Sequence, residues 1–132
     1  MIWIDYKDAT PIYEQIVNRF KNLIVSGVLS TDDKMPSVRN LAMELSINPN
    51  TIQKAYGELD SMGVICSVPG KGCFVSENAR ELLRQKEYEK LKEIQPLVLS
   101  MALAGVERGD VLACVEQAYE AAKQMGGNGT DD

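Results

Sequence analysis

Two short amphipathic segments, separated by a two-residue break at Ser46 and Ile47, restrict the folds open to this chain more than any other feature. Ser37 is a good N-cap for the first segment, while Asn48 can cap the second and Pro49 fits its first helical position. Two short helices joined by a tight turn are typical of a helix-turn-helix. The apolar residues recur at the helical period, at Val38, Leu41, Ala42 and Leu45 and then at Ile52, Ala55, Tyr56, Leu59 and Met62, before Gly63 ends the second segment.

The second helix of such a pair projects the polar residues of its first turns away from the core. Those residues are Asn50, Thr51, Gln53 and Lys54. They suit contact with a nucleic acid, but the solvated face of an ordinary core helix carries the same residue types. Periodicity alone leaves both interpretations open.

A longer amphipathic helix is predicted ahead of this pair, from Thr10 to Gly27. Thr10 is a good N-cap, Pro11 suits the first helical position, and Gly27 suits the left-handed position after the last turn. Its apolar positions are Ile12, Ile16, Val17, Phe20, Leu23 and Ile24.

A β-hairpin is predicted after the three helices. Its strands are the short β-prone runs 64–68 and 73–75, and Pro69-Gly70-Lys71-Gly72 forms the turn between them. The two glycines allow a close backbone approach and Lys71 adds a charge, so this tip suits a phosphate backbone or a minor groove. An ordinary hairpin turn would look the same, but its place directly after a helix-turn-helix favours the wing of a winged helix.

The second half of the chain is predicted to be helical. One helix should run from Ala79 to about Ala104, kinked or split at Pro96, and a last helix from about Arg108 to Met125. The final residues, 126–132, have the composition of a disordered tail. Two helices cannot close a core alone, so a second copy of the chain should cover their apolar residues, which are Leu97, Val98, Met101, Val111, Leu112 and Val115.

These patterns predict a mainly α fold with a small β-hairpin wing. Residues 1–76 form a winged helix-turn-helix domain, residues 77–125 a short all-helical dimerisation domain, and residues 126–132 the tail. No apolar run approaches the roughly 20 residues needed to span a bilayer, so we expect no membrane association and a cytoplasmic protein.

The composition argues against catalysis. The chain of 132 residues has no histidine, which removes the Ser-His and Cys-His nucleophile pairs and most metal sites, so we expect no enzyme activity, no catalytic residues, no metal and no cofactor. Three cysteines without a CxxC pair form neither a disulfide framework nor a zinc ribbon. We expect Cys66 and Cys73 to be small wing residues rather than a thiol switch or metal site, and Cys114 to lie in the core of the last helix.

The net charge of −5 at first argues against DNA, but its distribution matters more than its sum. Residues 1–76 carry seven basic and eight acidic side chains, net −1, while residues 77–132 carry seven basic and eleven acidic side chains, net −4. Most of the acidity therefore lies in the second half of the chain.

Three ordered motifs closely resemble the GntR family of bacterial transcription regulators over about residues 9–76. They are Lys34-Met35-Pro36-Ser37-Val38-Arg39-Asn40-Leu41-Ala42, then Asn48-Pro49-Asn50-Thr51-Ile52-Gln53-Lys54-Ala55-Tyr56, then Leu59, Gly63-Val64-Ile65 and Gly70-Lys71-Gly72-Cys73-Phe74-Val75. The third-helix motif and the short C-terminal remainder are similar to the YtrA-type branch, whose small helical second domain serves dimerisation.

The resemblance implies roles for individual residues. Arg39 matches an arginine that contacts DNA, although a surface ion pair with Glu44 would also account for it. The full set of DNA-binding positions that it implies is Ser37, Arg39, Asn50, Thr51, Gln53, Lys54, Gly70, Lys71 and Gly72. Many relatives carry arginine near Pro49 and Gln53, so this chain departs toward fewer charges, which predicts a modest electrostatic share of its affinity.

The implied function is a sequence-specific DNA-binding transcription regulator. It would act as a steric repressor, binding a palindromic double-stranded operator as a homodimer with half-sites about 34 Å apart. Any small-molecule effector would need a small site or one shared at the dimer interface. The alternative, favoured by the acidic balance, is a winged-helix module that binds protein and not DNA.

Overall fold

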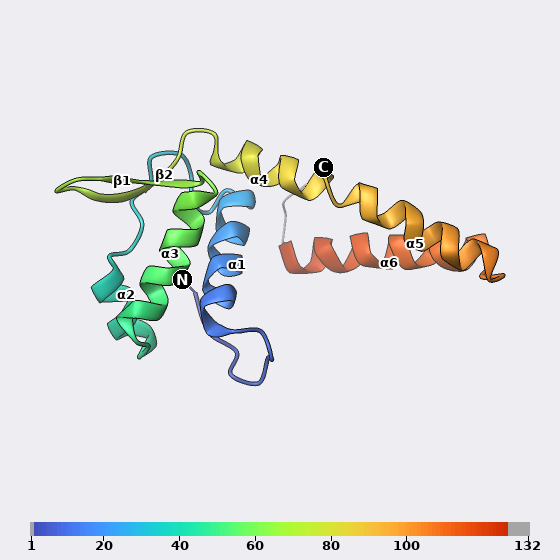
Figure 1. Ribbon diagram of the computed structural model, residues 1–132, viewed down its shortest axis with the longest axis horizontal. Coiled ribbons are helices and arrows are strands. Elements are labelled where there is room, and N and C mark those ends of the chain that lie inside the picture. Colours follow the sequence, from blue (N-terminus) through green and yellow to red (C-terminus); the bar gives the residue numbers. More distant parts are fainter. Residues whose placement is uncertain (1, 127–132) are drawn as a thin grey trace. The chain divides into compact units, whose positions relative to one another are not determined.

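The computed structural model describes residues 2–126, which divide into two compact units between Gln85 and Lys86 (Figure 1). The mainly helical architecture with a small hairpin confirms the predicted fold class. The elements are α1 (Ile12–Val25), α2 (Val38–Leu45), α3 (Pro49–Ser61), β1 (Ile65–Val68), β2 (Gly72–Val75), α4 (Ala79–Tyr88), α5 (Leu91–Leu103) and α6 (Arg108–Gly126).

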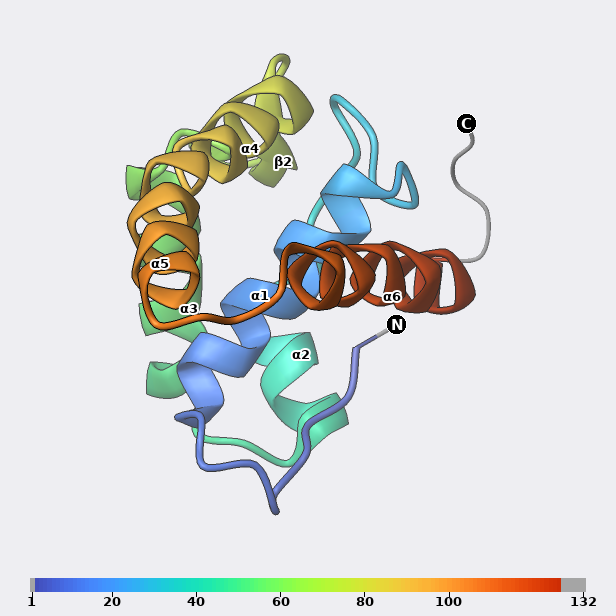
Figure 2. The same ribbon diagram turned by 90° about the vertical axis from the view of Figure 1, so that its right-hand side faces the viewer.

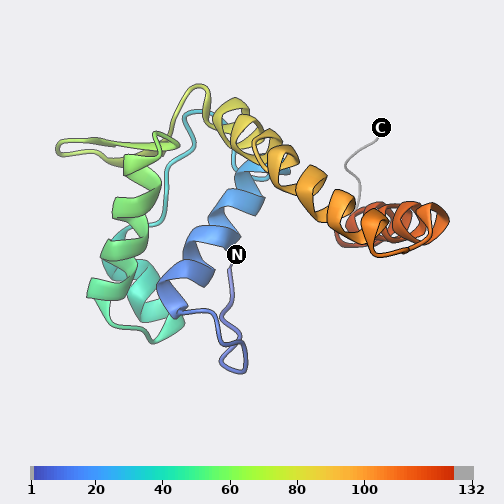
Figure 3. The same ribbon diagram turned by 45° about the vertical axis from the view of Figure 1, so that its right-hand side comes forward.

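The core of the first unit forms where α1 and α2 pack against α3, with the hairpin continuing from the end of α3 (Figures 1 and 3). Phe20 of α1 and Tyr56 of α3 meet edge to face, with ring centroids 5.8 Å apart. Burial of apolar area stabilises this arrangement. The largest fully buried side chains are Phe20, Ile16, Ile24, Leu41, Ile52, Leu59, Ile65, Val64 and Val75.

The caps of the helix-turn-helix confirm the sequence signals. The Ser37 hydroxyl accepts a hydrogen bond from the Asn40 N–H at 3.1 Å, and the Asn48 side chain accepts one from the Asn50 N–H at 2.8 Å. Ser46 lies in the left-handed region at φ 55°, which turns the chain sharply between α2 and α3. These local features end α2 at Leu45 and start α3 at Pro49, so that the two helices are joined by a tight turn.

The predicted N-cap of α1 was wrong. The helix begins at Ile12 after Pro11, and no side chain caps it. The buried Gln15 amide instead organises this end: its Nε2 donates to the carbonyls of Asp5 and Thr10, and its Oε1 accepts from the Asp5 N–H, all at 2.9–3.0 Å. The Thr10 carbonyl is thus held by the Gln15 side chain five residues later, a contact that capping rules do not contain.

The hairpin is antiparallel and pairs Ile65 with Val75 and Val68 with Gly72. The free edge of β2 is covered by the segment that leads into α2, because the Met35 N–H donates to the Cys73 carbonyl at 2.8 Å. Lys34 forms an isolated bridge with Phe74 in the same segment. The wing is therefore tied directly to the start of the helix-turn-helix.

The predicted long helix is split at Glu89 and Lys90, six to seven residues before Pro96, which itself lies inside α5. Proline pushes on the carbonyl four residues earlier, so the disturbed turn is the one that opens α5. The first unit reaches beyond residue 76, to Gln85, because Ala79 and Leu83 of α4 are buried in its core.

The second unit is a pair of helices, α5 and α6, without a core of its own (Figure 2). None of residues 86–125 is buried, and only Val98 and Val111 are half-buried. Cys114 is predicted to lie in the core but is exposed, since α6 packs against too little of the chain to cover it.

The predicted tail begins one residue too early, because Gly126 is the last residue of α6. The remaining residues of the predicted tail lie outside the described range. Of the helices between residues 2 and 126, none is both long enough and apolar enough to cross a membrane.

Candidate nucleic-acid interface

The first turns of α3 present polar side chains to solvent, as the sequence predicts. Asn50, Gln53 and Lys54 are exposed and Thr51 is half-buried, while the opposite side of the helix is buried through Ile52 and residues that follow it. Because Pro49 and the Asn48 cap fix the helix start, the positions of these side chains along α3 are well defined.

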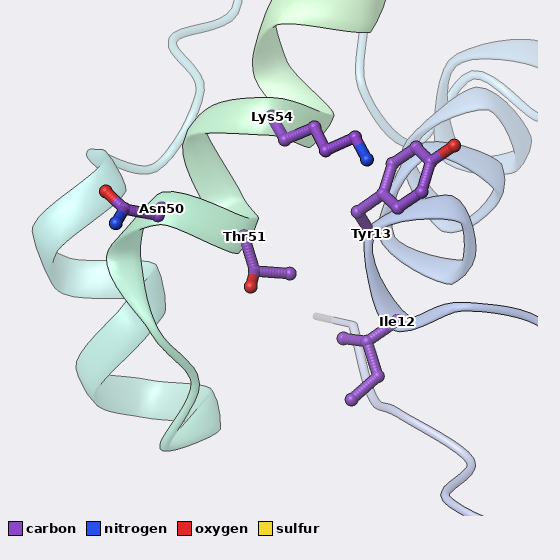
Figure 4. A pocket seen from close by; sticks show the side chains of 5 residues that line it. All are labelled: Ile12, Tyr13, Asn50, Thr51 and Lys54. Atoms are coloured by element: carbon purple, nitrogen blue, oxygen red, sulfur yellow. The ribbon is translucent and has the colours of Figure 1, made fainter.

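An open groove separates the start of α3 from the start of α1. It has a volume of about 450 Å³ and is lined by Ile12, Tyr13, Asn50, Thr51 and Lys54 (Figure 4). Three of the predicted positions therefore come together at one site, whereas Gln53 is not among the groove-lining residues.

Tyr13 contributes to this groove, although no motif in the sequence indicates it. The Lys54 ammonium nitrogen lies 3.9 Å from the centroid of the Tyr13 ring, which is a cation–π contact. Tyr13 is half-buried and packs against the core. Nothing local in the sequence links the two residues, because they lie on different helices about forty positions apart.

The start of α2 presents Ser37 and Arg39. The Ser37 hydroxyl is engaged as a cap, and both residues are exposed. The suggested ion pair between Arg39 and Glu44 is not formed, and no salt bridge within residues 2–126 involves Arg39. Its planar guanidinium is available for a phosphate or a guanine edge.

Tyr56 ties α3 to the chain entering α2. Its hydroxyl donates to the Pro36 carbonyl at 2.7 Å, and its side chain is almost fully buried. Burial raises the pKa of the Tyr56 phenol well above its ordinary value, and the nearby Cys73 thiol adds to the rise. Tyr56, which the sequence pattern counts only as an apolar residue, therefore also fixes the spacing between the candidate contacts on α3 and those at the start of α2.

The hairpin tip is exposed and depends on glycine. Gly70 and Gly72 have φ of 77° and 116°, and the Lys71 N–H donates to the Val68 carbonyl at 2.9 Å. A Cβ at Gly72 would lie 3.0 Å from the Lys34 side chain. The positive φ of this turn therefore disfavours other residues, and a side chain at Gly72 would also have to displace the end of the exposed Lys34 side chain.

The two wing cysteines lie on opposite faces of the hairpin. Cys73 is paired with Ser67, and its sulfur lies 3.4 Å from the Ser67 hydroxyl oxygen, whereas Cys66 is paired with Phe74 one position along. Neighbouring strand residues point to opposite faces, so this geometry opposes a disulfide between the two cysteines. In the described part of the chain, no group of three or more Cys, Asp or Glu residues is arranged to hold a metal ion.

The predicted dimer residues lie on the two helices of the second unit. Leu97 is 63%, Leu112 51% and Val115 47% exposed, which is high for aliphatic side chains, and Met101 is 37% exposed. A shallow groove lined by Gln95, Pro96, Val98, Leu99 and Ala102 runs along α5. These side chains form a largely uncovered apolar surface.

Comparison with known proteins gives matches to both units. Residues 12–75 match the family model described as bacterial regulatory proteins, gntR family. The HTH-type transcriptional repressor YtrA of Bacillus subtilis (strain 168) is 44% identical over 108 residues, which cover 81% of this chain and 83% of that protein.

Solved structures extend the similarity. A transcriptional antiterminator from Listeria monocytogenes EGD-e is 33% identical with a TM-score of 0.74, covering 100% of this chain and 97% of that one. The DNA-binding domain of AraR in complex with operator ORE1 is 32% identical with a TM-score of 0.50, covering 55% of this chain and 89% of that one. The last of these binds an operator through a domain that is similar to 55% of this chain.

Proposed function

This chain belongs to the gntR family of bacterial regulatory proteins and is a DNA-binding transcription regulator, and from that premise we propose that it represses transcription as a homodimer on a palindromic operator. The observation that carries the DNA-binding part of the proposal is the capped start of α3, which presents Asn50, Gln53 and Lys54 to solvent. A helix of this kind fits the major groove of B-DNA.

Each group of exposed residues has a role in this proposal. Asn50 and Gln53 carry amides that can pair with adenine, and Arg39 can form two parallel hydrogen bonds to a phosphate or a guanine. Ser37 and the first N–H groups of α2 face phosphate. Gly70, Lys71 and Gly72 place the hairpin tip against the backbone or in the minor groove.

The surface of the second unit supports the proposed dimerisation. With no residue between 86 and 125 buried, α5 and α6 expose their aliphatic side chains to water at a cost that a second copy would remove. The proposed interface comprises Leu97, Val98, Met101, Val111, Leu112 and Val115. Two protomers related by a two-fold axis would read two half-sites, which is why we expect a palindrome.

Repression would be steric, because a dimer seated across a promoter occupies the surface that RNA polymerase needs. A small-molecule effector would have to bind where two protomers meet, since the groove along α5 is shallow and open within one chain.

The test of DNA recognition is a selection from a library of random-sequence duplexes at low salt, followed by sequencing of the bound fraction. We expect a two-fold symmetric consensus with half-site centres about one helical turn apart, or a multiple of it. The variant Arg39→Ala should weaken binding to the selected duplex, whereas the exposed control Arg80→Ala on α4 should not. Failure to enrich any sequence would favour a protein-binding winged-helix module instead.

The test of dimerisation is analytical ultracentrifugation at micromolar concentration. The wild type should sediment at about twice the 14.6 kDa of one chain, and Leu112→Glu should shift it toward one chain. Gln117→Glu is a matched control, because it adds the same charge to α6 at an exposed polar position outside the proposed interface. A monomeric wild type would refute the homodimer.

A further inference from the structure

We propose that Tyr13 is a positioning residue for Lys54, and that it fixes the Lys54 ammonium as a phosphate contact on the flank of α3. This inference rests on the proposed DNA binding and assigns Lys54 to one of two ligands, phosphate rather than a base edge. It also adds to the interface a residue from α1, a helix to which no DNA contact has been assigned above.

Lys54 and Tyr13 are in direct contact. Figure 4 shows the Lys54 side chain crossing from α3 toward the face of the Tyr13 ring on α1, where its nitrogen lies 3.9 Å from the ring centroid. No salt bridge within residues 2–126 involves Lys54, so the aromatic face is the partner that holds its ammonium. A cation–π contact leaves the ammonium N–H groups free to bind an anion.

The Tyr13 ring offers the Lys54 ammonium a surface that is held by the core. Tyr13 is half-buried and packs against the core of the first unit, whereas Lys54 is exposed. A free lysine side chain samples many rotamers and loses that freedom when it binds. Contact with a fixed ring reduces this loss, because the ammonium is already held in one place before DNA arrives.

The Lys54 side chain points to the side of α3 that faces α1. Figure 4 shows Asn50 pointing away from Tyr13, while Lys54 reaches sideways across the groove toward it. A recognition helix in the major groove has base edges in front of it and sugar-phosphate backbones on its flanks. A side chain turned toward a neighbouring helix therefore carries its charge to a flank, where a compact ammonium suits a phosphate.

The groove itself fits this role. It is open, has a volume of about 450 Å³, and is bordered on one side by Tyr13 and Ile12 and on the other by Asn50, Thr51 and Lys54. A backbone phosphate entering it would meet the Lys54 ammonium beside the Tyr13 ring. Base recognition is then left to residues such as Gln53, which is not among the groove-lining residues.

The first experiment separates a phosphate contact from a base contact. Binding of wild type and Lys54→Met is measured by fluorescence anisotropy, from about 50 to about 200 mM salt, on the duplex obtained by selection and on an unrelated duplex of equal length. We expect Lys54→Met to weaken both complexes by a similar factor and to reduce the slope of log K against log salt by about one per protomer. Relaxed discrimination at a single base pair, with an unchanged slope, would overturn the assignment to phosphate.

The second experiment tests the positioning role of Tyr13. Tyr13→Phe keeps the ring face and should bind both duplexes like wild type, whereas Tyr13→Leu should weaken both by about two- to fivefold. In the Lys54→Met background, Tyr13→Leu should have no additional effect on binding. Thermal unfolding of each variant, read by circular dichroism, checks that the fold is intact at the assay temperature.

The outcomes distinguish this inference from the proposed function. If wild type binds DNA and Arg39→Ala weakens binding, but folded Tyr13→Leu binds like wild type, the positioning role is wrong and the regulator stands. Should Tyr13→Leu fail to fold, a large loss of binding by Tyr13→Phe, with its ring intact, would equally overturn the cation–π role. If wild type binds no duplex at all, the proposed function fails first.

Discussion

Replacement of Tyr56 by Phe removes a single hydroxyl from the junction between α3 and the chain entering α2. The ring stays, so its edge-to-face contact with Phe20 and its place in the core are preserved. The hydrogen bond to the Pro36 carbonyl, 2.7 Å long, is lost. The substitution therefore isolates one polar interaction within an otherwise apolar core.

The expected cost is about 1 kcal/mol of unfolding free energy, the typical net value of a neutral hydrogen bond. It does not rise to the roughly 3 kcal/mol of a buried unpaired group, because Pro36 is only half-buried and water can reach its carbonyl in part. For a unit of this size, that cost lowers the midpoint of thermal unfolding by about 4–8 °C.

The pH dependence of the unfolding free energy provides a second, independent test of the role of the Tyr56 hydroxyl. Because burial raises the pKa of Tyr56, the folded chain keeps the phenol proton at alkaline pH where the unfolded chain has lost it. Unfolding then releases a proton, so this group's contribution to stability is complete below pH about 10 and falls as pH rises beyond it. Tyr56→Phe lacks this loss, and the gap between variant and wild type should narrow above pH about 10.

Urea unfolding followed by circular dichroism, at one protein concentration and several pH values, measures both effects. Tyr119→Phe is the matched control, because Tyr119 is 75% exposed and should leave stability unchanged. A Tyr56→Phe protein as stable as wild type at neutral pH, or a gap that widens at alkaline pH, would refute the role assigned to the hydroxyl.

Three further substitutions test other parts of the first unit. Ser37→Ala removes the cap that accepts from the Asn40 N–H and should cost about 1 kcal/mol in urea unfolding, whereas an unchanged midpoint would contradict the capping role. Gln15→Leu removes three hydrogen bonds to the N-terminal segment and should make that segment more sensitive to limited proteolysis. Equal cleavage rates for variant and wild type would show that the Gln15 amide does not hold this segment. Gly72→Ala forces a side chain into φ 116° against Lys34 and should destabilise the wing by about 1–3 kcal/mol; a neutral effect would show that the turn relaxes easily.

The parts of the fold that sequence reasoning predicted depend on signals within a few residues. The Ser37 and Asn48 caps, Pro49 at the start of α3 and Gly63 after its end all act locally, and the hairpin follows from β-prone runs around a Pro-Gly turn. The polar side of α3 could likewise be predicted, because helical spacing alone determines which residues face away from a buried stripe.

The parts that it did not predict depend on contacts that reach outside a single helix or strand. Local rules favour Thr10 as a cap, but the Gln15 amide binds the Thr10 carbonyl and bridges it to Asp5. The pairing of Lys34 with Phe74 and the stacking of Lys54 on Tyr13 each join residues about forty positions apart. No periodicity or spacing within one element contains such information, so the sequence predicted the exposed row on α3, the start of α2 and the hairpin tip, but not the groove between α3 and α1.

The absence of a core between residues 86 and 125 has a thermodynamic consequence. A segment that buries no residue fully by itself would gain most of its tertiary stability in the proposed homodimer, and that gain follows mass action. The melting of α5 and α6 should therefore depend on protein concentration, whereas the packed first unit should melt at a temperature set by its own interior. In a cell, if the chain forms the proposed homodimer, its abundance would decide not only how many copies are paired but also how much of each copy is folded.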